Sequence, residues 1–162
     1  MDEATRVADA TKEGEGAPEL FYRRLFISYE TRDAKHLAIR AKRIFSGARH
    51  EAWVWCKDSQ SGAYIHEEIS GEIQACDRFV YICTANSDLS RGQRFERAQA
   101  LEWGPVIDVI AFDRQHVSSV LCHISARITT PHQFDATCNR LAKEFLKSPI
   151  PPRTVVVERY RG

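Results

Sequence analysis

The sequence lacks the features that would tie the protein to a membrane or to nucleic acid. No apolar run approaches the roughly 20 residues that cross a bilayer, and residues 1–19 are polar, without the apolar stretch of a signal peptide. The 23 basic and 22 acidic residues leave a formal net charge of +1, so there is no basic excess to attract a phosphate backbone. We therefore expect neither a membrane nor a nucleic acid as a partner.

The cysteines lack the pattern of a disulfide framework or a metal site. Their number, five, is odd and their spacing is irregular, which favours reduced thiols in a cytoplasmic protein. Cys122 is followed by His123, but no second pair of such residues lies at the spacing of zinc ligands. We expect no bound metal.

The chain is long enough for one domain with a single sizeable core. Residues 1–19 show no hydrophobic periodicity and are expected to form a disordered tail. Three prolines after residue 148 end the last helical pattern, so we place the domain at 20–148 and a C-terminal extension at 149–162. Within this extension, 154–157 suit either an edge strand or a segment that trails in solvent.

Hydrophobic periodicity predicts an alternation of strands and helices, with Asp33 as the N-cap of the first helix. The strands are continuously apolar, which is typical of a parallel sheet covered on both faces. We therefore predict one doubly wound α/β domain. The predicted strands are 24–30, 51–57, 78–84, 106–112 and 124–129, and the predicted helices are 33–45, 65–76, 87–101 (after a polar start) and 134–145.

Two families with this layout are excluded by the residues at the strand ends. A classical dinucleotide-binding fold needs a glycine-rich turn after its first strand, and the turn at 28–33 has no glycine. A phospho-receiver domain needs an aspartate at the end of its third strand, and the segment 83–86 (Cys-Thr-Ala-Asn) has no carboxylate.

Four motifs follow one another in the order of a third family. They are Phe26–Tyr29, Trp55–Asp58 followed by Gly62, Tyr81–Ser87, and Ser90 followed by Phe95-Glu96. Over about residues 22–148 they resemble a Toll/interleukin-1 receptor (TIR) domain, and more the bacterial, NAD-cleaving kind than an animal adaptor. The chain differs at Thr84, where the family more often has serine, and at 93–95, where a Trp-Cys pair often precedes the glutamate.

The resemblance implies both a fold and a reaction. The fold is a flavodoxin-like doubly wound sheet of five parallel strands in the order 2-1-3-4-5, with helices on both faces. The reaction is cleavage of the nicotinamide–ribose bond of NAD⁺, which is the substrate, so no cofactor is expected. Glu96 stands at the catalytic position, and one carboxylate suffices because nicotinamide leaves as a neutral molecule. Glu102 is the next candidate.

The substrate-binding residues are expected on both sides of the crevice between strands one and three. Aromatic faces suit nicotinamide or adenine, and Arg32 and Lys57 suit the pyrophosphate. Core packing for the aromatic residues and plain surface charge for the basic ones are the alternatives. The candidates are Ser28, Tyr29, Arg32, Trp55, Lys57, Asp58, Thr84, Asn86, Ser90 and Phe95.

Charge is divided between the first two predicted helices, basic on the first and acidic on the second. This division suits head-to-tail self-association, or two ordinary solvated faces.

The resemblance further implies a signalling product that a downstream effector senses, in bacterial antiviral defence. A non-enzymatic TIR adaptor or virulence module is the alternative function. A nucleoside deoxyribosyltransferase shares the fold, but we find no acidic residues placed for it.

Overall fold

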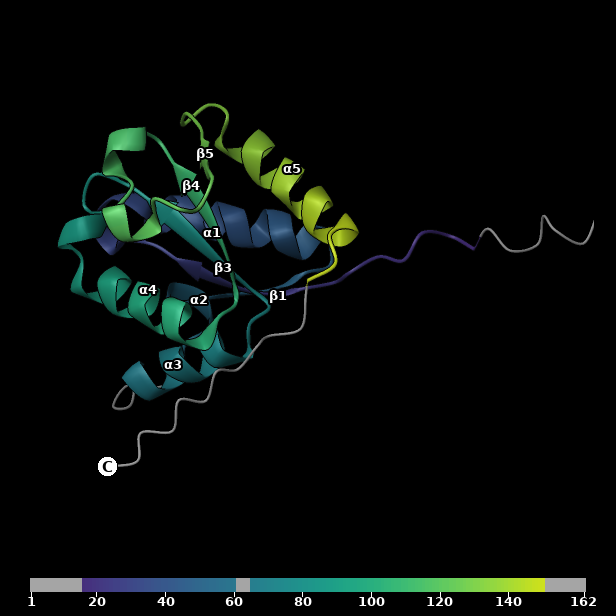
Figure 1. The fold of residues 1–162 in the computed structure, drawn as a ribbon, viewed down its shortest axis with the longest axis horizontal. Coiled ribbons are helices and arrows are strands. Elements are labelled where there is room, and N and C mark those ends of the chain that lie inside the picture. The colour runs from purple at the N-terminus through teal and green to yellow at the C-terminus, as the bar shows by residue number, and fades with distance from the viewer. Residues whose placement is uncertain (1–15, 61–64, 151–162) are drawn as a thin grey trace, which may run out of the picture.

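The computed structural model describes residues 16–60 and 65–150, and its centre is a five-stranded, all-parallel sheet (Figure 1). The strand order is β2-β1-β3-β4-β5, so the direction of winding reverses between β1 and β3. This confirms the predicted flavodoxin-like, doubly wound α/β fold. The strands are β1 (Arg24–Ser28), β2 (Glu51–Val54), β3 (Arg78–Cys83), β4 (Val106–Ala111) and β5 (Ala126–Ile128).

Helices cover both faces of the sheet and divide the apolar residues into two cores (Figure 1). One pair of helices, α1 and α5, packs on one face, and the other pair, α3 and α4, packs on the opposite face. The bounds are α1 (Thr31–Gly47), α3 (Ile65–Ala75), α4 (Arg91–Trp103) and α5 (Phe134–Lys147).

The alternation of side chains along β1 determines which residues can meet α4. Leu25 and Ile27 belong to the core under α1 and α5, whereas Phe26 belongs to the core under α3 and α4. Ser28 shares the parity of Phe26 and is fully buried. Its hydroxyl therefore reaches the α4 side at the carboxyl end of the central strands.

The second strand is shorter than predicted. It ends at Val54, and Trp55–Asp58 form a helical turn, α2. The carboxylate of Asp58 closes this turn, because its Oδ2 accepts hydrogen bonds from the Val54 N–H (2.8 Å) and from Nζ of Lys42 (2.6 Å). The prediction that the strand continues to Lys57 was wrong, because side-chain capping overrides the apolar alternation.

The N-cap of α1 is Glu30, so the assignment of Asp33 to this position was wrong. The Glu30 carboxylate accepts a hydrogen bond from the Arg32 N–H (3.3 Å), and the helix begins at Thr31. Asp33, in the first turn, instead binds side chains that follow β3.

Three short 3₁₀ turns complete the described part of the chain. η1 (Ser87–Leu89) is the polar start that precedes α4, whereas η2 (Arg114–His116) and η3 (Ser119–Leu121) were not predicted. Leu121, at the end of η3, is buried in the core under α3 and α4. This contact anchors the connection between β4 and β5 to the α4 side of the sheet.

Three predictions concern residues outside the described ranges. They are most of the disordered tail (residues 1–15), Gly62, and the edge strand at 154–157. Within the described ranges, no helix is long and apolar enough to cross a membrane. The same ranges hold no group of three or more His, Cys, Asp or Glu side chains placed to bind a metal ion. All five cysteines are free thiols.

Candidate active site

Glu96 is buried on the inner face of α4. The helix begins at the N-cap Ser90, whose Oγ accepts a hydrogen bond from the Gln93 N–H (3.1 Å). Gln93, Glu96 and Ala100, spaced three and four residues apart, form the buried stripe of the helix. This stripe faces β1, where the Ser28 hydroxyl donates a 2.5 Å hydrogen bond to Oε2 of Glu96.

Glu96, a residue that is only 8% exposed, lines a cavity of about 390 Å³ beyond the carboxyl end of β1. This volume falls in the range of about 300–1,000 Å³ found for small-molecule sites. Its walls come from the β1–α1 junction, α2, α3 and the start of α4. The lining residues are Tyr29, Glu30, Thr31, Arg32, Trp55, Ile65, His66, Ile69, Leu89, Ser90, Arg91, Gly92 and Glu96.

Two carboxylates line this cavity, and their pKa values shift in opposite directions. Burial raises the pKa of Glu96 to about 8, with a further contribution from the charge of Glu30, while the Ser28 hydrogen bond opposes the shift. Burial also acts to raise the pKa of Glu30, but hydrogen bonds from Ser90 and Arg32 outweigh it and hold that pKa below its ordinary value. At neutral pH the free protein therefore holds an ionised Glu30 beside a largely protonated Glu96.

Four of the predicted binding residues line this cavity, and a fifth, Ser28, contacts Glu96 without lining the cavity itself. Ser28 contacts Glu96 directly, and Ser90 starts the helix that carries it. Trp55, on α2, is 38% exposed and lies at the rim. The last two, Tyr29 and Arg32, lie on either side of Glu30 in the sequence and line the cavity with it.

The side chains beside Glu30 differ in exposure. Nε of Arg32 donates to Oε1 of Glu30 (2.9 Å), and the Arg32 side chain as a whole is 60% exposed. Most of the Tyr29 ring is buried in the core under α1, and burial raises its pKa. Packing is therefore the main role that the structure gives to Tyr29.

Thr84 and Asn86 do not line the Glu96 cavity, contrary to the expected placement. Oγ1 of Thr84 donates to Oδ1 of Asp33 (2.8 Å), and Nδ2 of Asn86 donates to Oδ2 of Asp33 (2.9 Å). The two donors thereby hold the first turn of α1 against the loop after β3. Thr84 and Asp33 line a separate cavity of about 260 Å³.

Three further candidates also lie elsewhere. Asp58 is occupied in closing α2, and Lys57, on the same turn, does not line the Glu96 cavity. Phe95 is half-buried, contacts His66 edge-on with ring centroids 4.9 Å apart, and lines a groove on the outer face of α4. Glu102, the alternative carboxylate, is exposed and outside the cavity.

The residues that sequence reasoning missed are Glu30, His66 and Arg91. Glu30 directly follows the first-strand motif, so its position beyond β1 was a usable signal. His66 follows the loop after α2, and nothing in the local pattern brings it to the strand ends. Arg91 is the first residue of α4, and the N-cap signal of Ser90 could have placed it.

The family model for the TIR domain matches residues 25–140. The chain therefore belongs to the TIR domain family. Among solved structures, the CMP N-glycosidase BcmB of Clostridium botulinum is similar in fold, with a TM-score of 0.56 and 13% sequence identity, over 75% of this chain and 98% of that one. No curated protein matches the sequence significantly.

Proposed function

We propose that this TIR domain cleaves the nicotinamide–ribose bond of NAD⁺, as a glycohydrolase or cyclase, with Glu96 as its catalytic residue. The observation that carries the proposal is the position of the Glu96 carboxylate, buried in a ligand-sized cavity and held by Ser28. A buried carboxylate in a cleft with a strongly shifted pKa is typical of a functional group.

The reaction suits a single carboxylate. The bond between ribose C1′ and the pyridinium nitrogen breaks, its electron pair leaves with neutral nicotinamide, and positive charge develops on the ribose. An ionised Glu96 beside the ribose stabilises that charge. Water then adds to C1′ and releases a proton, which gives linear ADP-ribose, or an internal nucleophile adds and gives a cyclic product.

The raised pKa of Glu96 fits a cationic substrate. In the free protein the carboxyl group is largely neutral at pH 7, since its pKa is about 8. The positive pyridinium ring of NAD⁺, on entering the cavity, favours the ionised form and lowers this pKa. Substrate binding thus charges the group that the transition state requires.

Trp55, Arg32 and Ser28 suit supporting roles in this proposal. Trp55 presents a partly exposed ring at the rim, where a planar nicotinamide or adenine can stack on it. The Arg32 side chain is largely exposed at the cavity, where its guanidinium suits a phosphate. Ser28 positions the reacting carboxylate through its hydrogen bond.

Cleavage of a nucleoside monophosphate is the second candidate, because the structurally similar BcmB is named a CMP N-glycosidase. A cytosine base leaves with negative charge unless it is protonated, so that reaction needs a general acid. NAD⁺ needs no general acid, so its cleavage can rest on Glu96 alone, with the ionised Glu30 held by hydrogen bonds from Ser90 and Arg32. Incubating the purified protein with NAD⁺ or with CMP, and separating the products by chromatography, distinguishes the two. Release of cytosine without release of nicotinamide overturns the proposal, and release of neither base favours a non-enzymatic TIR module.

We further propose that the domain self-associates and that its product acts as a signal for a downstream effector in bacterial antiviral defence, in the cytoplasm. The charges expected to drive assembly are partly used within the chain: Arg40 pairs with Asp135 (2.8 Å), and Glu72 pairs with Arg24 (3.7 Å). Charge reversal at Arg40 therefore also breaks an ion pair within the domain, besides altering any contact between domains. Specific activity that rises with protein concentration is the cleaner test of assembly.

A further inference from the structure

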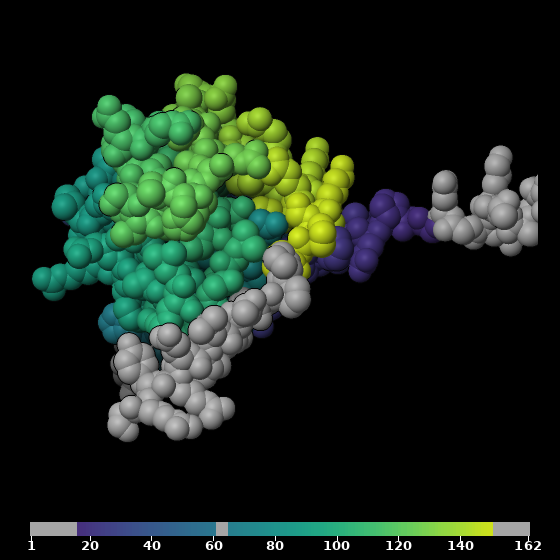
Figure 2. Space-filling model, viewed as in Figure 1, coloured from purple at the N-terminus to yellow at the C-terminus, as the bar shows by residue number. Residues whose placement is uncertain are grey.

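A second groove runs along the outer face of α4, next to the Glu96 cavity. Its volume is about 580 Å³, and it lies between α4 and η3, on the face of the molecule that Figure 2 presents. The helical spacing of its residues places them on one side of α4. They include Arg91, Arg94, Phe95, Ala98 and Leu101, with Val120 on η3 opposite.

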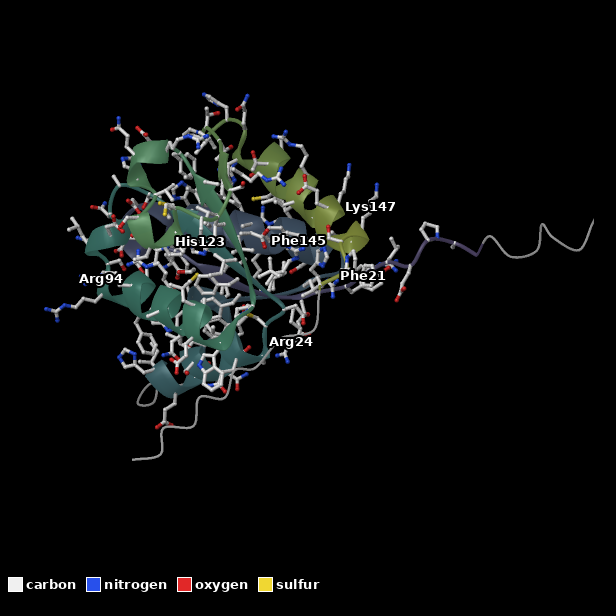
Figure 3. All side chains as sticks on the ribbon, in the orientation of Figure 1. Phe21, Arg24, Arg94, His123, Phe145 and Lys147 are labelled. Carbon is white, nitrogen blue, oxygen red and sulfur yellow. The ribbon has the colours of Figure 1, made fainter. Side chains whose placement is uncertain are left out.

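Two arginines in this groove have no partner in the part of the chain that the structure describes. Among the described residues, the guanidinium groups of Arg91 and Arg94 form no hydrogen bond or ion pair, whereas the neighbouring Arg97 pairs with Asp88 (3.2 Å). Both side chains are exposed, and Figure 3 shows Arg94 extending away from the body of the protein. The groove therefore combines free positive charge with the apolar surface of Phe95, Leu101 and Val120.

The groove and the Glu96 cavity share a residue. Arg91 lines both, so a ligand that fills the cavity next to Glu96 can continue past Arg91 on to the outer face of α4. Arg91 is also the first residue of this 13-residue helix, where the helix dipole adds to the positive potential.

We propose that this groove binds the diphosphate and adenosine of the dinucleotide, with the phosphates at Arg91 and Arg94 and the adenine against Phe95. The inference rests on the proposed function, and it makes the substrate class a dinucleotide rather than a mononucleotide. Arginine side chains suit phosphate oxygens because they donate several charge-assisted hydrogen bonds. A half-buried aromatic ring such as that of Phe95 gives adenine a flat surface to stack on.

Two measurements with the variant Arg94→Glu test this inference. The first is ADP binding by calorimetry, which needs no catalysis, and we expect at least about 10-fold weaker binding than in the wild type. The second is turnover of NAD⁺ and of nicotinamide riboside, which share the scissile bond. We expect the ratio of kcat/KM for NAD⁺ to that for nicotinamide riboside to fall about 10-fold. Arg140→Glu, the same change at an exposed position of α5, is the matched control.

The outcomes separate this inference from the proposed function. ADP binding that depends on Arg94, in a protein that cleaves no NAD⁺, supports the binding site in the groove and contradicts the proposed NAD⁺ cleavage. NAD⁺ cleavage with equal ADP binding and an equal substrate ratio in Arg94→Glu and Arg140→Glu overturns the groove and leaves the reaction standing. A change in oligomeric state of Arg94→Glu without any change in ADP binding identifies a protein contact surface, which also overturns the inference.

Discussion

The Ser28 hydroxyl donates a 2.5 Å hydrogen bond to Oε2 of Glu96, and so joins the end of β1 to the middle of α4 across 68 positions of the chain. The bond connects two of the four sequence motifs that resemble a TIR domain. It is also the one interaction that lowers the pKa of Glu96 against the effect of burial.

Replacing Ser28 by alanine should lower the activity at pH 7 by about 10-fold or more, since a hydrogen bond to a charged group contributes about 1.5–3 kcal/mol. Loss of this bond raises the pKa of Glu96 further, so activity should recover at higher pH. The measurement is the pH profile of kcat/KM, with Ser28→Thr as the control that keeps the hydroxyl. Equal loss for both variants at every pH would show that packing around Ser28, and not its hydrogen bond, matters.

The pH dependence of the wild type follows from the direction of the same shift. If ionised Glu96 is the active form, kcat/KM should rise with pH and level off above about pH 8, the pKa of this group in the free protein. The midpoint for kcat should lie lower, because the bound pyridinium cation favours the carboxylate. A kcat/KM that stays constant from pH 6 to 9 would contradict this account.

Stability should show the opposite dependence on pH. The pKa of Glu96 is raised on folding from 4.5 to about 8, so the folded state binds the additional proton between these values. The contribution of the neutral Glu96 carboxyl to the free energy of unfolding is complete below pH 4.5. It is lost as the pH rises to about 8, at up to about 1.4 kcal/mol per pH unit. Glu96→Gln has no carboxyl group to ionise, so its stability does not fall in this way.

We therefore expect the melting temperature of Glu96→Gln to exceed that of the wild type by an amount that grows between pH 5 and pH 9. Thermal unfolding at three pH values measures it, and the exposed Glu102→Gln serves as control. A difference that does not vary with pH would mean that Glu96 titrates alike in the folded and unfolded chains.

The two tryptophans around β2 should respond differently to substitution. Trp53 stacks on Phe26 with ring centroids 5.1 Å apart, whereas Trp55 lies partly exposed at the cavity rim. Because Trp53 is only partly buried, Trp53→Ala should cost less than the about 3–5 kcal/mol of a fully buried aromatic residue, but more than Trp55→Ala. Trp55→Ala should mainly raise KM for NAD⁺. Parallel losses of melting temperature and activity in Trp55→Ala would assign Trp55 to the core.

Asp33 offers a test of the corrected placement of Thr84 and Asn86. Asp33→Ala removes the acceptor of both side chains and should destabilise the domain by about 1–3 kcal/mol. Because none of the three lines the Glu96 cavity, KM for NAD⁺ should change little. Denaturant unfolding and steady-state kinetics measure the two effects. A large rise in KM at unchanged stability would show that these residues belong to the substrate site after all.

The fold was predictable from the sequence because its strands are continuous apolar runs and its helices have clear periodicity. The failures have local causes. The end of β2 was misassigned because the capping by Asp58 depends on Lys42, sixteen positions away. The 3₁₀ turns between β4 and β5 lack any periodic signal.

The sequence motifs placed some residues of the candidate site correctly and others not. Glu96, Ser28, Ser90 and Trp55 came together as expected, since strand ends and helix starts converge at one edge of the sheet. Thr84 and Asn86 did not, because both donate hydrogen bonds to Asp33, which lies at the start of α1 after β1. The sequence does not show that Asp33 and the loop after β3 lie close together in the fold.

The most direct test of the account is nicotinamide release from NAD⁺ by the wild type, Glu96→Gln and Glu102→Gln at equal concentration. Losing one preorganised charge at the transition state typically costs about 100- to 1,000-fold in rate. We predict a loss of this size for Glu96→Gln, with the fold retained, and wild-type release for Glu102→Gln. Wild-type release by Glu96→Gln, or its loss in Glu102→Gln alone, would contradict the assignment of Glu96 as the catalytic residue.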